Sequence, residues 1–374
     1  MYWPVDGKPE LMEKDAIYLS DQQLWAFVSE VFLRMGHSPE DAYLATDVLL
    51  EADLRGIDSH GIARLLGYVR LWEAGRVNTR PNIRLVREAT AAATVDGDGG
   101  LGLIVAPRAM DIAIKKAAAT GVGMISICNS NHFGIAAYHA LKAVPHHMIG
   151  MAMTNASPLV APTHSKEKLL GTNPHCWVFP TRQFDPLVFD MASSAAANGK
   201  LEMAERAGKP IPEGWAIDKD GNPSTDPGIL RQGGALLPLG SDADHGSHKG
   251  YGMGAIADLL SGVLSGANFG PWVPPFVSFL QPPADPVGKG IGHFVGALRI
   301  DAFRELDEYY DAIDTWTKRF KSAVPSNPDE PVLVHGEPEM KQYRDRKKNG
   351  IHINEKVFAD MQIISDKFKI DIEG

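Results

Sequence analysis

The spacing of apolar and polar positions divides this chain of 374 residues into three zones. Up to about residue 84, apolar residues recur at three- and four-residue intervals, which predicts helices. Between residues 85 and 300, short β-branched or apolar runs alternate with Gly and Pro, as is typical of strands and loops. From 301 to 374 the helical spacing returns. We therefore expect an α+β protein in which a C-terminal helical segment, 301–374, packs with an N-terminal helical domain, 1–84, around a mixed-sheet domain, 85–300.

Local signals locate individual elements within these zones. Ser20 and Gln23 form a candidate capping box, and the run from Ser38 to Asp41 is typical of a second helix start. Strands are expected at Ala91–Val95, Gly123–Cys128, Ile149–Asn155, Cys176–Pro180, Leu187–Met191 and Val295–Ile300. Helices are expected at Ala106–Thr120, Ala136–Val144, Ser193–Ala207, Gly250–Ser265, Asp301–Lys321 and Asn354–Phe368.

A third N-terminal helix is expected where Asp58 or Ser59 can accept the free backbone N–H groups of a first turn. On such a helix His60, Arg64 and Tyr68 follow at four-residue steps and share one face. Histidine is well suited to proton transfer near neutral pH, and the planar fork of arginine matches a carboxylate. The pattern thus indicates chemistry on a small anionic carbonyl or hydroxyl compound. The alternative is a solvated polar face.

Composition narrows the class of protein. A net charge of −9 offers no basic face for nucleic acid. Cys128 and Cys176 lie in apolar runs, so we expect buried free thiols in a reducing compartment. The segment Met1–Asp6 lacks a secretion signal, and no apolar run approaches the length of a membrane span. We expect a cytoplasmic protein without a membrane partner.

The run Gly97–Gly102 fits the G-x-G-x-x-G pattern of a dinucleotide-binding turn and lies between an expected strand and an expected helix. That site also needs an acidic residue after the second strand to bind the ribose. No Asp or Glu occurs between Gly121 and Ser165. We interpret these glycines as a tight turn and not as a Rossmann site.

Three other segments carry candidate chemistry. The loop 129–134 follows a strand and offers His132 as a second acid or base, although a loop histidine is often only a polar surface group. The small residues of 190–194 join a strand to an expected helix start, which suits a phosphate but also an ordinary capped helix. In 248–252, Lys249 stands at the positive end of a helix, where it is unfavourable unless an anion compensates.

Two further classes of protein stay open on residue patterns alone. Asp242, Asp244, His245 and His248 could serve a metal-dependent hydrolase or lyase, yet they lie in a Gly/Ser-rich loop without a second ligand cluster. A solvated loop is the preferred interpretation, and no metal is expected. A non-catalytic ligand-binding protein is the other alternative.

Taken in order, these motifs resemble the type-2 malate/L-lactate dehydrogenases. That family also includes sulfolactate and ureidoglycolate dehydrogenases, diketogulonate reductase and piperideine-2-carboxylate reductase. The motifs that carry the resemblance are Asp58-Ser59-His60-Gly61 with Arg64, Asn131-His132-Phe133-Gly134, Thr154-Asn155, Gly171-Thr172-Asn173-Pro174, Asp190-Met191-Ala192, Lys249-Gly250-Tyr251-Gly252 and Gly336-Glu337-Pro338.

The resemblance implies a non-Rossmann mixed sheet that binds NAD or NADP, a helical domain built from both chain ends, and a homodimer. It implies hydride transfer between NAD(P)H and a small 2-keto or 2-hydroxy acid such as malate or L-lactate. A cyclic imine or a sugar-derived keto acid is the alternative substrate. This chain departs from the family's pattern at His175 and in the proline-rich segment 268–290. We expect these differences to alter the mouth of the pocket.

The resemblance also assigns roles to residues. His60 is implied as the proton donor, with His132 as a competing candidate, Arg64 as the carboxylate clamp, and Ser59 and Tyr68 as substrate-binding residues. Family members often carry Ser at Ala156, so a backbone or Ser157 contact is expected instead. The implied cofactor-binding residues are Ala156, Ser157, Thr172, Asn173, Asp190, Met191, Ala192, Ser193, Ser194, His248, Lys249, Gly250, Gly336, Glu337 and Pro338.

Overall fold

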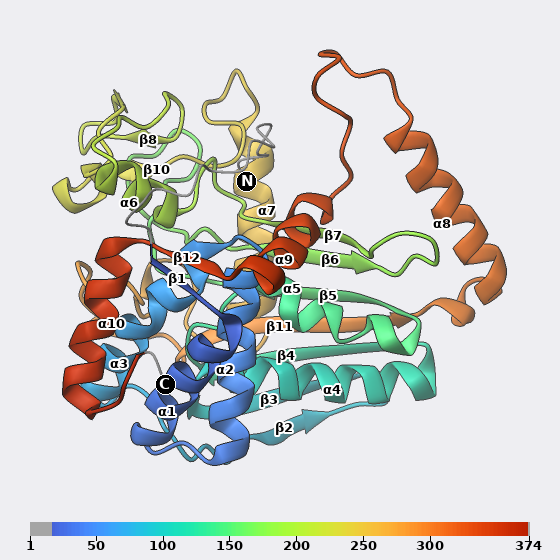
Figure 1. Ribbon diagram of the computed structural model, residues 1–374, viewed down its shortest axis with the longest axis horizontal. Coiled ribbons are helices and arrows are strands. Elements are labelled where there is room, and N and C mark those ends of the chain that lie inside the picture. Colours follow the sequence, from blue (N-terminus) through green and yellow to red (C-terminus); the bar gives the residue numbers. More distant parts are fainter. Residues whose placement is uncertain (1–16, 373–374) are drawn as a thin grey trace.

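A computed structural model describes residues 17–372, and a seven-stranded mixed sheet forms its centre (Figure 1). In spatial order the strands are β2 (Arg84–Glu88), β3 (Ala92–Gly100), β4 (Val122–Ser130), β11 (Ile291–Arg299), β5 (Met148–Thr154), β6 (His175–Phe179) and β7 (Leu187–Met191). Within this sheet β3 and β4 run parallel, and every other neighbouring pair is antiparallel. The expected α+β class with a non-Rossmann mixed sheet is confirmed.

Helices cover both faces of the sheet, because successive side chains of a strand point to opposite faces. Val295 and Ala297 of β11 belong to the apolar core shared with α4 and α5, whereas Phe294 packs with Ala257 of α7 on the other face. The backbones approach closely at Gly123, where an added Cβ would lie 1.9 Å from the Ala113 carbonyl oxygen of α4. The bounds are α4 (Gly102–Thr120), α5 (Ala136–Leu141) and α7 (Ser247–Asp258), which continues as a π-helical segment, Leu259–Val263.

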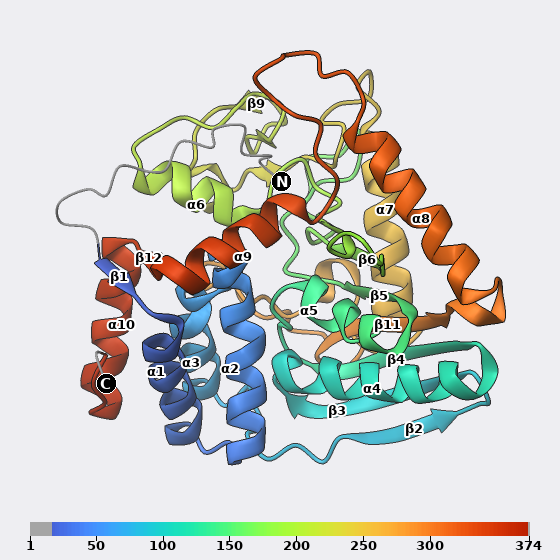
Figure 2. The same cartoon turned by 45° about the vertical axis from the view of Figure 1, so that its right-hand side comes forward.

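Helices from both chain ends form a second group beside the sheet (Figure 2). They are α1 (Asp21–Arg34), α2 (Pro39–Leu54), α3 (Leu65–Glu73), α9 (Glu337–Asn349) and α10 (Glu355–Phe368). The short strands β1 (Ile17–Leu19) and β12 (Ile351–Ile353) pair antiparallel and join the two ends. The expected capping box of Ser20 and Gln23 is present. The expected helical domain from both termini is therefore confirmed.

The helix α8 (Leu306–Lys321) lies apart from this group, along the end of the sheet near β6 and β7 (Figure 1). It is anchored by Arg182, whose guanidinium pairs with Asp307 at 2.5 Å and with Asp311 at 3.4 Å. Thus α9 and α10, but not α8, lie against the N-terminal helices. The domain boundaries at residues 84 and 300 stay a prediction.

A smaller unit stands above the helical group in Figure 1. It contains α6 (Asn198–Arg206) and a three-stranded sheet of β10 (Ala235–Leu236), β8 (Ala216–Ile217) and β9 (Pro223–Ser224). The expected helix at 193–207 was wrong at its start. Ser193 is held as irregular chain because its N–H and hydroxyl both donate to the Thr172 carbonyl, at 2.9 Å each. The segment 190–194 therefore does not form a helix N-terminus.

The expected third helix also needs correction. Residues 58–64 form two short 3₁₀ turns, and the α-helix begins only at Leu65. His60, Arg64 and Tyr68 consequently do not share one α-helical face, and Tyr68 is fully buried instead of lying on a polar stripe.

The cause of this break lies in the side chains that surround the turns. Neither Asp58 nor Ser59 caps the turn. Asp58 instead forms an ion pair with Arg346 of α9, and the carboxylate of Asp53 accepts the Ile62 N–H at 2.7 Å. An aspartate from the end of α2 and a distant arginine of α9 therefore replace the cap that the sequence suggested.

Candidate active site

The two candidate histidines meet although they are 72 positions apart in sequence. His60 comes from the first 3₁₀ turn, and His132 comes from the loop between β4 and α5. Their rings are stacked, with centroids 5.8 Å apart. Arg64 donates to the carbonyl of Ser59, whose hydroxyl contacts His60, and its positive charge contributes to the lowered pKa of both histidines. The fold thus brings the implied proton donors and the implied carboxylate clamp into one place.

The hydrogen bonds of His132 define its tautomer. The hydroxyl of Tyr68 lies 2.6 Å from His132 Nδ1, and the Gly134 N–H points at the same nitrogen from 3.4 Å. Burial raises the pKa of Tyr68, so its hydroxyl keeps its proton and can donate. Because a backbone N–H can only donate, Nδ1 is assigned as an acceptor, and neutral His132 carries its proton on Nε2.

His60 has a different partner. Its Nδ1 lies 2.9 Å from the hydroxyl oxygen of Ser59, which can accept a proton from Nδ1 as well as donate one. Burial, with Arg64 adding to it, lowers the pKa of His60 to about 4. Burial lowers the pKa of His132 well below its ordinary value, and electrostatic repulsion from His60 and Arg64 adds to this effect. Both rings are therefore neutral near pH 7, because they are desolvated and close to a cation, and not because of a helix dipole.

Packing fixes the loop that carries His132. The ring of Phe133 lies between His139 and His293, with centroid distances of 4.6 and 4.8 Å. The side chain of Asn131 donates to the Gly99 carbonyl at 2.9 Å. These buried contacts bind the loop to both α5 and the central strand β11, so the imidazole of His132 is held on a rigid support.

Arg64 has two partners in the structure. Its Nε donates to the Ser59 carbonyl at 2.5 Å, and its Nη2 lies 3.1 Å from a carboxylate oxygen of Glu202 on α6. Phe276, from the proline-rich segment, packs on His132 with centroids 4.5 Å apart. Sequence reasoning missed both Glu202 and Phe276. No local pattern marks them, since only the tertiary fold brings Glu202 to Arg64 and Phe276 to His132.

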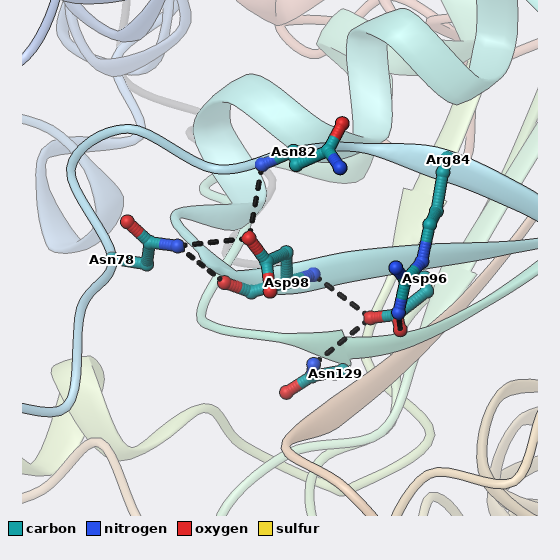
Figure 3. A network of polar contacts seen from close by, with 6 residues as sticks. All are labelled: Asn78, Asn82, Arg84, Asp96, Asp98 and Asn129. Atoms are coloured by element: carbon teal, nitrogen blue, oxygen red, sulfur yellow. Dashed lines mark hydrogen bonds and ion pairs between the residues drawn. The ribbon is translucent and has the colours of Figure 1, made fainter.

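The glycine-rich turn at 97–102 does join a strand to a helix, but its polar groups are already used (Figure 3). Asp98 accepts the side-chain amide of Asn78 and the backbone N–H of Asn82, each at 3.0 Å. Asp96 accepts the Asp98 N–H and the amide of Asn129, each at 2.9 Å. Two carboxylates at this turn would repel a pyrophosphate. The geometry therefore agrees with interpreting these glycines as a tight turn.

Most of the implied cofactor residues lie along α7, between its first turn and Gly254. Asn173 is fully buried and links the Ala156 N–H to the Gly254 carbonyl at 3.1 and 2.9 Å. An added Cβ on Gly254 would lie 2.8 Å from Ser193 Oγ. Thr172 is bound to Ser193 by the hydrogen bonds already described. Nearby are Met191 and Ala192 at the end of β7, Ser194, which bridges to Pro238, and Gly250, which packs on Leu239.

The start of α7 can hold an anion. The helix begins at Ser247, its N-cap Gly246 offers no side chain to the first turn, and His248 and Lys249 are exposed there. The sequence prediction that Lys249 stands at the positive end of a helix is confirmed in this respect. Ser247 and Lys249 already donate their backbone N–H groups to the carbonyls of Asp242 and Gly246. What this helix start offers to an anion is its positive end and the exposed ammonium of Lys249, which suit a phosphate of a dinucleotide.

The remaining implied residues lie near this cluster or beside it. Ser157 accepts the Phe276 N–H at 2.9 Å, so it connects the cofactor-side loop to the ring that packs on His132. Asp190 accepts the Ala137 N–H at 2.8 Å, and burial raises its pKa to about 6. Gly336, Glu337 and Pro338 open α9 against the first half of β7, where Glu337 forms an ion pair with Lys321.

Other candidate sites do not assemble. Within residues 17–372 no group of three or more His, Cys, Asp or Glu side chains is arranged to hold a metal ion. The exposed pair of Asp242 and His245, 2.8 Å apart, is a local contact of a surface loop. Cys128 and Cys176 are buried free thiols, as expected.

Comparison with known proteins identifies one family. The malate/L-lactate dehydrogenase family matches residues 19–362. Malate dehydrogenase of Pyrococcus horikoshii is 40% identical over 97% of this chain and 98% of its own. Malate/(S)-sulfolactate dehydrogenase of Methanothermus fervidus is 36% identical, with 95% and 99% covered. The crystal structure of malate dehydrogenase from Entamoeba histolytica superposes with a TM-score of 0.88 at 31% identity, covering 95% of this chain and 99% of that one.

The chain belongs to the malate/L-lactate dehydrogenase family. Within that family it is a dehydrogenase of 2-hydroxy acids that works with a nicotinamide cofactor. The alternatives of a metal-dependent hydrolase or lyase and of a non-catalytic ligand-binding protein are therefore not supported. Separately, none of the helices in the described range 17–372 has the length and apolar content to cross a membrane.

Proposed function

We propose that this enzyme interconverts a small 2-hydroxy acid and its 2-keto acid, with His60 transferring the proton and Arg64 binding the carboxylate. The hydrogen bond between Tyr68 and His132 is the observation that carries this division of roles. It keeps Nδ1 of His132 as an acceptor and leaves a proton on Nε2. Neutral His132 can then donate a hydrogen bond to a substrate oxygen but cannot accept a proton at Nε2.

His60 is free to adopt the complementary tautomer. When Nδ1–H donates to the Ser59 hydroxyl, Nε2 is left without a proton and can act as a base. In the oxidising direction His60 then takes the proton from the substrate hydroxyl while His132 Nε2–H stabilises the oxygen. In the reducing direction His60 returns the proton. A positioned acid or base commonly contributes about 10²–10⁴ in rate.

Arg64 supplies orientation. Its guanidinium presents a planar fork that can bind a carboxylate through two parallel hydrogen bonds. Because the carboxylate of a 2-keto acid is bonded to the reacting carbon, holding it fixes the position of that carbon. The ring of Phe276 over His132 excludes water from one side of this place.

The residues around α7 are proposed to hold NAD or NADP. Lys249 and the first turn of α7 fit a phosphate, and Ala156, Asn173 and Ser193 provide a rigid wall of small and amide side chains. Bound nicotinamide supplies or accepts the hydride at the substrate carbon.

A substrate panel tests the proposal. Oxaloacetate, pyruvate, 3-sulfopyruvate and a cyclic imine, Δ1-piperideine-2-carboxylate, are each offered with NADH and with NADPH, and nicotinamide absorbance is followed. We expect turnover of at least one 2-keto acid at a rate well above that of the imine. Faster turnover of the imine would favour the reductase alternative, and no turnover of any compound would contradict the proposal.

We also propose a homodimer, supported by apolar side chains that one copy leaves exposed along α7 and its π-helical extension. Ile256, Leu259 and Leu264 are 52%, 55% and 60% exposed. Apolar patches of this kind are typical of contact surfaces. Light scattering during gel filtration is expected to give twice the 40.6 kDa chain mass. Leu259→Glu should shift the protein toward the monomer, whereas a wild-type monomer would contradict the proposal.

A further inference from the structure

The carboxylate clamp of the proposed site is already holding a carboxylate from its own chain. Nη2 of Arg64 lies 3.1 Å from Oε2 of Glu202. The Arg64 side chain is 15% exposed and the Glu202 side chain is 28% exposed, so the pair is partly shielded from water. Arg64 is the residue proposed to bind the substrate carboxylate, which makes Glu202 chemically equivalent to the substrate group.

The helix α6 delivers this carboxylate to Arg64. Asn198, one turn before Glu202, donates its side-chain amide to Oε1 of Glu202 at 2.7 Å. Gly199 lies directly on the first 3₁₀ turn, where an added Cβ would be 2.5 Å from Ser59 Cβ and 3.2 Å from Arg64 Nη2. The hydrogen bond from Asn198 orients the Glu202 carboxylate, and Gly199 lets α6 approach closely. Together they bring Oε2 of Glu202 to the guanidinium of Arg64.

We propose that Glu202 occupies the place of the substrate carboxylate on Arg64 until substrate binds, and that the incoming carboxylate displaces it. This inference rests on the proposed function, because it requires Arg64 to be the carboxylate clamp. Binding then exchanges one ion pair of Arg64 for another. Glu202 lowers the affinity for every 2-keto acid, and it leaves Arg64 closed to carbonyl compounds that lack a carboxylate.

The energetics allow such an exchange. A partly exposed ion pair contributes up to about 1 kcal/mol, which corresponds to about a fivefold change in a binding constant. A substrate carboxylate can overcome a penalty of that size through its own paired hydrogen bonds. Leu201 and Ala204 hold α6 in an apolar cluster, so the exchange requires the Glu202 side chain to swing away from Arg64 while the helix stays in place.

The experiment compares KM and kcat of the holoenzyme for the keto acid that the panel identifies. Glu202→Gln keeps the size of the side chain and its acceptor for Asn198 but removes the charge. We expect KM to fall about fivefold while kcat stays within about twofold. Glu205→Gln is the matched control, since Glu205 is on the same helix and pairs with Arg231 instead. Its KM should equal that of the wild type.

A second variant separates direct contact from the field of the charge. Glu202→Asp keeps the charge but shortens the side chain, so KM should also fall if displacement of a contact is the mechanism. A KM that is unchanged or raised in Glu202→Gln, or a wild-type KM in Glu202→Asp, would overturn the inference.

The Arg64→Ala variant distinguishes this failure from failure of the proposed function. If Arg64→Ala leaves KM unchanged, the carboxylate clamp itself is wrong, and the inference falls with it. If Arg64→Ala raises KM but Glu202→Gln does not lower it, the clamp stands and only the competition by Glu202 is refuted.

Discussion

The hydroxyl oxygen of Tyr68 lies 2.6 Å from Nδ1 of His132, across 64 positions of sequence. The bond joins a fully buried side chain of α3 to the loop after β4. Because it sets which nitrogen of His132 carries the proton, it separates the roles of the two histidines.

Tyr68→Phe removes the hydroxyl and leaves Nδ1 of His132 without its main donor. A buried acceptor that loses its partner costs about 1–3 kcal/mol, which favours the other tautomer of His132. We therefore expect kcat to fall about tenfold. KM for the keto acid should change little, since Arg64 is untouched. Steady-state kinetics check both values, and an unchanged kcat would show that the tautomer of His132 has no part in turnover.

Exchanging each histidine should separate the two candidates for proton transfer. His60→Ala is expected to lower kcat by about 10²–10⁴ while NADH still binds, because only the proton carrier is lost. His132→Ala should cost less, since it removes a hydrogen bond to the substrate oxygen. The opposite order of losses would assign proton transfer to His132.

The pH dependence follows from the lowered pKa of His60, about 4 instead of 6.5. Reduction of the keto acid needs the protonated ring, whose fraction falls tenfold for each pH unit above about 4. Between pH 5 and 8, kcat/KM for reduction should therefore decline without a plateau below 6.5. Oxidation of the hydroxy acid needs the neutral ring and should be nearly flat over the same range. A break near pH 6.5 in both directions would contradict this.

Lys249 should matter for the cofactor and not for the substrate. Lys249→Gln removes a charge at the start of α7, where a charge-assisted bond to phosphate contributes about 1.5–3 kcal/mol. The Kd for NADH or NADPH, read from quenching of tryptophan fluorescence, should rise at least tenfold. Lys115→Gln, at an exposed position on α4 across the sheet, is the control and should leave the Kd unchanged.

Acid stability should depend on His37, which is 2% exposed and has no hydrogen-bond partner for either ring nitrogen within the described structure. Burial lowers its pKa to about 4, so the folded state binds this proton less readily than the unfolded state. The resulting stabilisation is complete above pH 6.5 and is lost as pH falls toward 4. Between pH 7 and 5 the wild type should lose about 2 kcal/mol more unfolding free energy than His37→Phe. Urea unfolding at both pH values measures the difference, and equal losses would contradict it.

The sequence predicted the main elements because their signals are local. Capping residues at Ser20 and Ser38, together with the strand-like runs from 91 to 191, specify helices and strands through contacts within a few residues. The dinucleotide-binding pattern at 97–102 could also be rejected from the sequence, because the acidic residue that such a site needs is absent between Gly121 and Ser165. The ordered motifs were enough to indicate the family.

Local reasoning failed at the turn 58–64 because its partners come from other elements, the end of α2 and the distant helix α9. Asp53 and Arg346 take the roles that a helix cap would have had, and they shorten the expected helix to α3. The helix predicted from Ser193 likewise starts at Asn198, because Thr172 binds Ser193 from another loop. Polar partners from other elements overrode the local preference in both cases.

By itself the sequence determined the α+β class, the central sheet, the helical group of both chain ends and the residue types of the site. Only the tertiary structure decided which of these residues meet and how they are protonated. It stacked His60 on His132, turned Tyr68 inward to donate to one ring nitrogen, and placed Glu202 on Arg64. The physical reason is that tautomers, lowered pKa values and ion-pair partners depend on burial and on contacts between distant segments, which a local pattern does not contain.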